Sequence, residues 1–194
     1  MPTRTARLAA LGVLTLAASP ALAHTGAGSA ASVMDGFLHP LGGLDHVLAM
    51  VAVGLWAGFT GGRAVWAYPL AFLSFMVVGG LFGIADVGLP SVETGIALSV
   101  VVLGAALAFG LKLPAAAGSA LVAAFAVFHG HAHGAEMAAG ADAAGYAAGF
   151  VAATALLHGI GIALSPRAVP RLPLMATRAA GSAMALAGIG LLVL

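Results

Sequence analysis

Apolar residues run along this chain in long uninterrupted stretches, separated by short breaks that carry glycine, proline and charge. Six such stretches follow one another, over residues 42–61, 64–85, 93–111, 114–135, 143–164 and 174–194. Each is close to the roughly 20 residues that a helix needs to cross a lipid bilayer. The pattern therefore predicts an all-α integral membrane protein, a six-helix bundle without a second, soluble domain.

The first residues form a separate pattern. Arg4 and Arg7 precede an apolar stretch that is too short to cross the bilayer, and a small-x-small sequence ends at Ala23. We interpret residues 1–23 as a cleaved signal peptide and residues 24–194 as one domain of six transmembrane spans. The alternative is an additional transmembrane helix. Cleavage after Ala23 leaves the mature N-terminus on the extracytoplasmic side.

Composition supports the membrane assignment. Hydrophobic residues make up 62% of the chain and charged residues only 7%, whereas about a quarter of a soluble domain is charged. So few charges cannot cover a surface that faces water. We therefore expect the chain to be surrounded by the lipid bilayer and to bind no nucleic acid. The chain has no cysteine, which excludes disulfides and thiolate metal sites.

The charged residues indicate how the bundle is oriented. With six spans and an outer N-terminus, all six acidic residues lie on the outer side or in the outer part of a span. Every basic residue of the mature chain lies on the other side: Arg63, Lys112, Arg167, Arg171 and Arg178. Because basic loops stay in the cytoplasm, we expect a multi-pass protein of the bacterial inner membrane. A helix count different by one would destroy this pattern.

A first group of imidazole and carboxylate side chains, which are energetically unfavourable in a bilayer, lies at the start of the first span. His39, Asp45 and His46 lie at its outer edge, and such groups within a membrane are expected to mark a functional site. In a continuous helix His39 and His46 would share a face, with Asp45 close by. The alternative is a break at Gly42 and Gly43, which would offer carbonyl oxygens as further ligands.

A second group closes the fourth span. His129 and His133 are four residues apart and share a helical face, which Glu136 extends, whereas His131 points elsewhere. Neutral imidazoles with a carboxylate suit nickel, cobalt, zinc and copper(II). Both groups lie in the outer part of their spans although they are more than eighty residues apart in sequence. We therefore predict that they bind one metal ion.

Three histidines are weaker candidates for metal binding. His158 lies near the midplane of the fifth span and is either a deeper station for the ion or a donor to a backbone carbonyl. His131 and His24 are expected to be exposed polar residues, although a free amine beside His24 would form a weak chelate.

The two motifs resemble those of the HupE/UreJ family of bacterial membrane proteins. They read His-x5-Asp-His from His39 to His46 and Phe-His-Gly-x-Ala-His-Gly-x-Glu from Phe128 to Glu136, and the resemblance covers essentially the whole chain. It implies a permease for nickel, or cobalt, that supplies hydrogenase or urease maturation. It also implies importance for six residues: His39, Asp45, His46, His129, His133 and Glu136.

We therefore expect a transporter, not an enzyme, with Ni²⁺ or Co²⁺ as substrate and no permanently bound cofactor. No nucleotide-binding glycine loop is present, so uptake would use the membrane potential. The expected protein partners are further copies of the chain, in a homo-oligomer, and cytoplasmic nickel chaperones. One alternative is a membrane metalloenzyme, such as a zinc-dependent hydrolase, although the chain has no His-Glu-x-x-His motif. The other is a metal sensor at the periplasmic face that does not transport.

Overall fold

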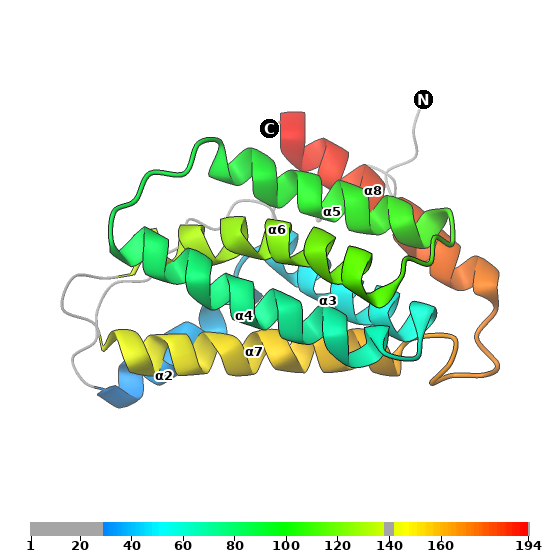
Figure 1. Cartoon of the computed structure of the whole chain (residues 1–194), viewed down its shortest axis with the longest axis horizontal. Coiled ribbons are helices and arrows are strands. Elements are labelled where there is room, and N and C mark those ends of the chain that lie inside the picture. The colour runs from blue at the N-terminus through cyan, green and yellow to red at the C-terminus, as the bar shows by residue number, and fades with distance from the viewer. Residues whose placement is uncertain (1–28, 138–141, 194) are drawn as a thin grey trace, which may run out of the picture.

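A computed structural model describes residues 29–137 and 142–193, and within these ranges the chain is helical, without strands (Figure 1). The elements are α2 (Ser29–Leu38), the 3₁₀ turn η1 (His39–Leu41), α3 (Leu44–Thr60), α4 (Ala64–Ile84), α5 (Val92–Ala108), α6 (Ala115–Ala135), α7 (Ala143–Ala163) and α8 (Leu174–Val193). The all-α prediction is confirmed for this part of the chain. The predicted signal peptide and His24 lie outside the described residues.

The predicted apolar stretches correspond to α3 through α8, with ends that differ by at most three residues. Among the described helices, α4, α6, α7 and α8 are each long and apolar enough to cross a membrane. Helix α3 passes the same test only together with the preceding α2 and η1, and α5 is shorter, with 17 residues. The chain is thus a multi-pass membrane protein, while the count of six spans stays a prediction.

The chain bends sharply between the first histidine and the second. The axis of α3 is turned by 82° from that of the preceding α2 and η1 segment, and Gly43 at the joint is extended. The continuous-helix interpretation of this motif is therefore wrong, and the broken one is correct. The carbonyls of His39 and Gly43 accept the amide hydrogens of Gly42 and Val47, at 3.0 and 3.1 Å, so both are already engaged in backbone hydrogen bonds.

Glycines let pairs of helices approach until their backbones touch. A Cβ atom added to Gly130 of α6 would lie 1.9 Å from the carbonyl oxygen of Met76 in α4. One added to Gly54 of α3 would lie 2.1 Å from the carbonyl oxygen of His158 in α7. Gly104 of α5 meets α8 in the same way. Such small-residue contacts are the usual means of close helix association in lipid, and they fix the helices that carry the histidines.

The bundle has two chemically different ends. The connections after α3, α5 and α7 lie together at one end (Figure 1). There the Arg167 guanidinium donates to the carbonyls of Gly58, at 3.3 Å, and Phe59, and the Lys112 ammonium lies 5.0 Å from the centre of the Phe59 ring. We call this the basic end. The first residues of α3 and the last of α6, which carry the histidine motifs, lie at the opposite end.

Between the histidines and the basic end the interior is filled by aromatic and aliphatic side chains. Trp56, Tyr68 and Phe72 are completely buried. The Trp56 indole donates to the carbonyl of Leu111 at 2.8 Å, and the Tyr68 hydroxyl donates to that of Leu113 at 2.9 Å. These bonds tie the packed aromatic residues to the connection between α5 and α6. The half of the bundle nearer the basic end is therefore closed.

The outer surface of the helices is also apolar. Large hydrophobic side chains project from it, among them Trp66, Leu70, Leu81, Phe109, Met175 and Leu186. A surface of this kind avoids water and suits contact with lipid chains. The polar and charged side chains are thus concentrated at the two ends of the bundle, the histidine end and the basic end.

Candidate metal site

Three ligating side chains meet at the histidine end. His39, His133 and Glu136 each offer one nitrogen or oxygen atom, and these atoms lie within 4.8 Å of one another. Nε2 of His39 is 3.0 Å from Oε2 of Glu136, and the His39 and His133 rings are 4.7 Å apart. We call these residues the outer trio. Glu136 is 58% exposed and His133 only 5% exposed, so the trio leads from the surface into the bundle.

The end of α6 brings Glu136 to this position. The helix stops at Ala135, and the amide of Glu136 still donates to the carbonyl of Ala132 at 3.0 Å. Its side chain is therefore free to reach His39 in η1. The hydrogen bond from His39 is the main cause that holds the pKa of the Glu136 carboxyl below its ordinary value. An ionised carboxylate at the surface is well suited to attract a cation.

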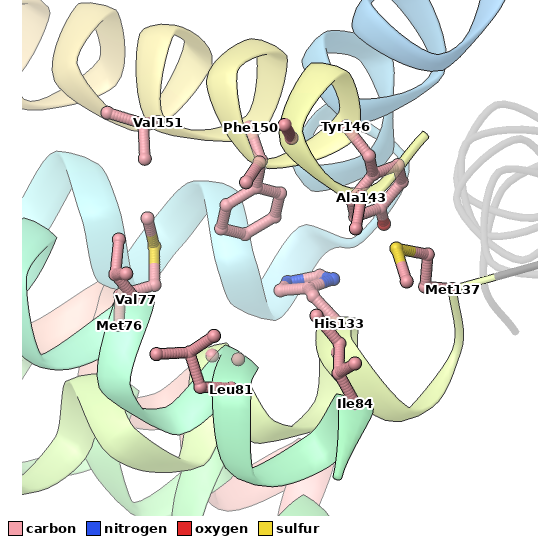
Figure 2. Close-up of a pocket in the computed structure, with 15 residues that line it drawn as sticks. Met76, Val77, Leu81, Ile84, His133, Met137, Ala143, Tyr146, Phe150 and Val151 are labelled. Atoms are coloured by element: carbon pink, nitrogen blue, oxygen red, sulfur yellow. The ribbon is translucent and has the colours of Figure 1, made fainter. Parts of the chain in front are cut away.

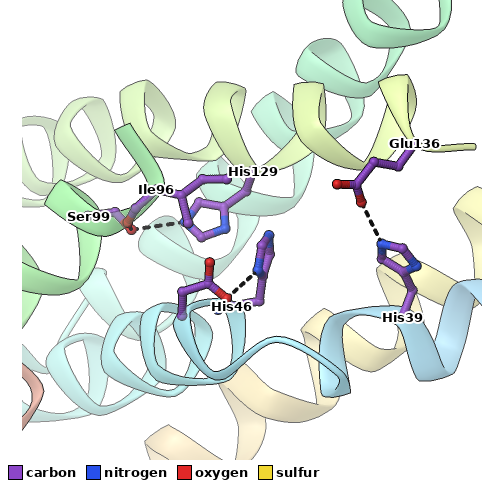
Figure 3. A network of polar contacts seen from close by, with 7 residues as sticks. His39, His46, Ile96, Ser99, His129 and Glu136 are labelled. Carbon is purple, nitrogen blue, oxygen red and sulfur yellow. Dashed lines mark hydrogen bonds and ion pairs between the residues drawn. The ribbon is translucent and has the colours of Figure 1, made fainter. Parts of the chain in front are cut away.

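A second, deeper group shares His133 with the outer trio. The ring of His46 lies 4.4 Å from that of His133 and 4.8 Å from that of His129. All three are buried, and we call them the inner trio. Four imidazoles thus form an unbroken series from the half-exposed His39 inward. Figure 3 shows three of them, His39, His46 and His129. The two sequence motifs meet in space, as their common depth suggested, although their role in metal binding stays a prediction.

Asp45 orients the central histidine. Its Oδ1 lies 2.8 Å from Nδ1 of His46 and accepts the backbone amide of His46 at 2.8 Å. Because an ionised carboxylate can only accept, Nδ1 of His46 carries the hydrogen. Nε2 of His46 then holds the lone pair, and it is buried without a hydrogen-bond partner among the described residues. A carboxylate that fixes the tautomer in this way is the usual support of a metal-binding histidine.

The inner end of the series is aromatic. The Phe72 ring is in contact with those of both His129 and His158, at centroid distances of 5.4 Å and 5.1 Å. His158 is 1% exposed, and neither of its ring nitrogens has a hydrogen-bond partner in the described part of the chain. The interpretation of His158 as a donor to a backbone carbonyl is therefore wrong. An unpartnered imidazole at this depth is instead available to a ligand.

His131 is turned away from both trios, as its spacing predicts. Its Nε2 lies 2.8 Å from the carbonyl oxygen of Val87, in the connection between α4 and α5. This contact anchors a loop and explains the residue without a metal ion.

Two pockets of about 240 Å³ each reach these residues. One opens between α4, α6 and α7 and is lined almost entirely by apolar side chains, with the His133 imidazole pointing into it between Phe150 and Met137 (Figure 2). The other is more polar and is bordered by Asp45 and Glu93. A hydrated cation would avoid the apolar pocket, which leaves the polar pocket and the exposed outer trio as the approaches open to it.

Sequence reasoning missed Ser99 of α5. This residue is completely buried, and its hydroxyl lies 2.9 Å from Nε2 of His129. A serine in an apolar helix is usually a small residue at a helix–helix contact. The position of Ser99 in the sequence therefore did not indicate a hydrogen bond to a histidine. Glu93 at the polar pocket was likewise recognised only as one of the outer acidic residues.

Comparison with known proteins identifies the family of the chain. The family model described as "HupE / UreJ protein" matches residues 12–191. The chain belongs to the HupE/UreJ family. One relative of this HupE/UreJ chain, Protein HupE of Rhizobium leguminosarum bv. viciae, is 48% identical to it over 177 residues. These residues cover 91% of this chain and 93% of the relative. No solved structure matches the chain.

Proposed function

We propose that this HupE/UreJ chain takes up a divalent transition metal ion across the bacterial inner membrane. The observation that carries the proposal is the series of imidazoles from His39 to His129, with carboxylates at Glu136 and Asp45. Membership of a family associated with nickel or cobalt uptake for hydrogenase and urease supports it. Nickel is the proposed main substrate and cobalt a second one, because nitrogen ligands with few carboxylates suit both ions.

In this proposal the outer trio captures the ion and the inner trio receives it. His133 belongs to both groups and has no hydrogen-bond partner at either ring nitrogen among the described residues. Neither tautomer is therefore fixed, and the imidazole can bind an ion through one nitrogen or the other, one at a time. An ion that exchanges ligands one at a time is never fully stripped of them. Conduction requires sites that are numerous and individually weak, and the spread of imidazoles over several ring distances meets this requirement.

The deeper part of the path is closed in this conformation. The ring of Phe72 packs against those of His129 and His158, and the packed residues around Trp56 and Tyr68 close the way to the basic end. We propose that this is an outward-facing state and that Phe72 moves aside to let the ion reach His158. Six spans, with the basic end in the cytoplasm, complete the proposed topology.

Uptake should follow the membrane potential. We expect purified protein in liposomes to accumulate ⁶³Ni²⁺ when the interior is negative, because a divalent ion gains about 4.6 kcal/mol per 100 mV, or on the order of a thousand-fold at equilibrium. Collapsing the potential should lower the plateau. Metal that binds to the vesicles without entering them would overturn the proposal and favour a sensor at the outer face.

Neutralising the exposed carboxylate should weaken capture. In Glu136→Gln the side chain keeps its length and a carbonyl oxygen that can still accept from His39, but the negative charge that attracts the cation is lost. We expect half-saturation of nickel uptake to require about 10 times more metal, with a nearly unchanged maximal rate, since the inner trio is intact. Uptake kinetics over a range of nickel concentrations measure both quantities. A lower maximal rate with unchanged half-saturation would contradict a role in capture.

A further inference from the structure

Ser99 of α5 has two polar neighbours inside the bundle. Its hydroxyl oxygen lies 2.6 Å from the carbonyl oxygen of Ile96, one turn back in the same helix, and 2.9 Å from Nε2 of His129 in α6. Ser99 and His129 are both completely buried. Bulk water therefore cannot reach either side chain, and the polar groups of Ser99, His129 and Ile96 must hydrogen-bond to one another.

The positions of the hydrogens follow from what each group can do. A carbonyl oxygen only accepts, so the single hydroxyl hydrogen of Ser99 is donated to Ile96. The Ser99 oxygen then has lone pairs left, and the hydrogen in its contact with His129 comes from Nε2 of the imidazole. His129 is thus the Nε2–H tautomer, and its lone pair is on Nδ1. That Nδ1 is buried and has no partner among the described residues.

The free lone pair of His129 belongs to the inner trio. The His129 and His46 rings meet edge to face at 4.8 Å, and in Figure 3 Ser99 contacts His129 on the side away from His46. The carboxylate of Asp45 holds His46 in the opposite tautomer, with its lone pair on Nε2. The two histidines therefore present different ring nitrogens to the space between them.

We propose that Ser99 is a positioning residue that locks His129 in the Nε2–H tautomer, so that the ion binds His129 through Nδ1 and His46 through Nε2. The inference rests on the proposed function, because it assigns the ligand atoms of that same site. It adds a residue from α5 to a site whose other residues come from η1, α3, α6 and the residue that follows α6. Ser99 acts through His129 and does not itself bind the ion.

The choice of a hydroxyl has a consequence for transport. A carboxylate behind a histidine adds negative charge and makes the imidazole a stronger ligand. Asp45 does this for His46 near the entrance, whereas the neutral Ser99 orients the deeper His129 without adding charge. The deeper ligand therefore releases the ion more readily, as a conducting site requires.

The tautomer can be measured directly. We expect ¹⁵N NMR of full-length, histidine-labelled, metal-free protein in nanodiscs to show His129 protonated at Nε2, with its signals assigned by their loss in His129→Asn. In Ser99→Ala the Nε2–H loses its buried acceptor, so His129 should become a mixture of tautomers. Affinity for Ni²⁺ by titration should fall about 10- to 100-fold, as for other groups that orient metal-binding histidines.

Two further variants separate orientation from packing. Ser99→Thr keeps the hydroxyl, and a threonine in a helix can donate to the same i−3 carbonyl, so it should restore both the tautomer and the affinity. Thr154→Val removes another completely buried hydroxyl, which donates to Sδ of Met76 at 3.6 Å and not to a histidine. This control should change neither the tautomer nor the affinity.

The outcomes distinguish the inference from the function it rests on. Hydrogen on Nδ1 of His129 in the wild-type protein, or the same tautomer and nickel affinity in Ser99→Ala, would overturn the role of Ser99. Because the tautomer is read without metal, it is independent of transport. If the wild-type protein has the expected tautomer but does not accumulate nickel in liposomes, the role of Ser99 in fixing the tautomer is supported and the proposed transport function is overturned.

Discussion

Replacing His46 with alanine is expected to reduce nickel uptake to the level of protein-free liposomes. His46 lies at the centre of the series, with its ring in contact with those of both His129 and His133. Its loss removes a ligand from the inner trio and also leaves Asp45 without the imidazole that it orients. The loss should therefore exceed the roughly 100-fold upper limit that is typical of supporting residues. Initial rates of ⁶³Ni²⁺ uptake measure it.

The matched control for this variant is His131→Ala. His131 lies in α6 between His129 and His133 in sequence, but its imidazole contacts the carbonyl of Val87 and belongs to neither trio. Its removal should leave uptake close to the wild-type rate. Both variants should reach the membrane in equal amounts, because alanine is compatible with a helix. Uptake that survives in His46→Ala, or fails equally in His131→Ala, would exclude the imidazole series as the path.

The order of the helices could be predicted from sequence because a chain within lipid must satisfy its backbone hydrogen bonds internally. Each long apolar stretch has only one stable solution in a bilayer, a helix, and glycine, proline or charge marks its ends. Helix α6, for example, was expected over 114–135 and occupies Ala115–Ala135. The depth of a residue then follows from its distance to the nearest end. Depth is why His46 and His129 could be expected at one level.

Contacts between helices depend on rotation about each helix axis, and one sequence contains little information on that rotation. Ser99 is the clearest case, since its contact with His129 depends on which side of α5 faces α6. The bend before α3 is another. The glycines allowed both a continuous and a broken helix, and only packing decides between them. Gly36 of α2, which lies against the backbone of Tyr146 in α7, shows how the preceding segment is held.

The glycine contact between α4 and α6 should be as important for the site as a ligand. In Gly130→Ala the new Cβ atom would lie 1.9 Å from the carbonyl oxygen of Met76. Backbone on the other helix cannot give way cheaply, so the two helices must separate. Overpacking of this kind costs about 1–3 kcal/mol. Gly130 follows His129 directly, so a displaced α6 should carry its imidazole away from His46 and abolish nickel binding.

The sign of the effect makes this prediction specific. Alanine favours an isolated helix over glycine by about 1 kcal/mol, so propensity alone would make Gly130→Ala more stable. Gly190→Ala in α8 is the matched control, because nothing lies within 4 Å of its added Cβ atom. We expect thermal unfolding in detergent to show a lower midpoint for Gly130→Ala and an equal or higher one for Gly190→Ala. Equal midpoints together with intact nickel binding would mean that α4 and α6 are not in backbone contact, and that the histidines of α6 are positioned by something other than this glycine.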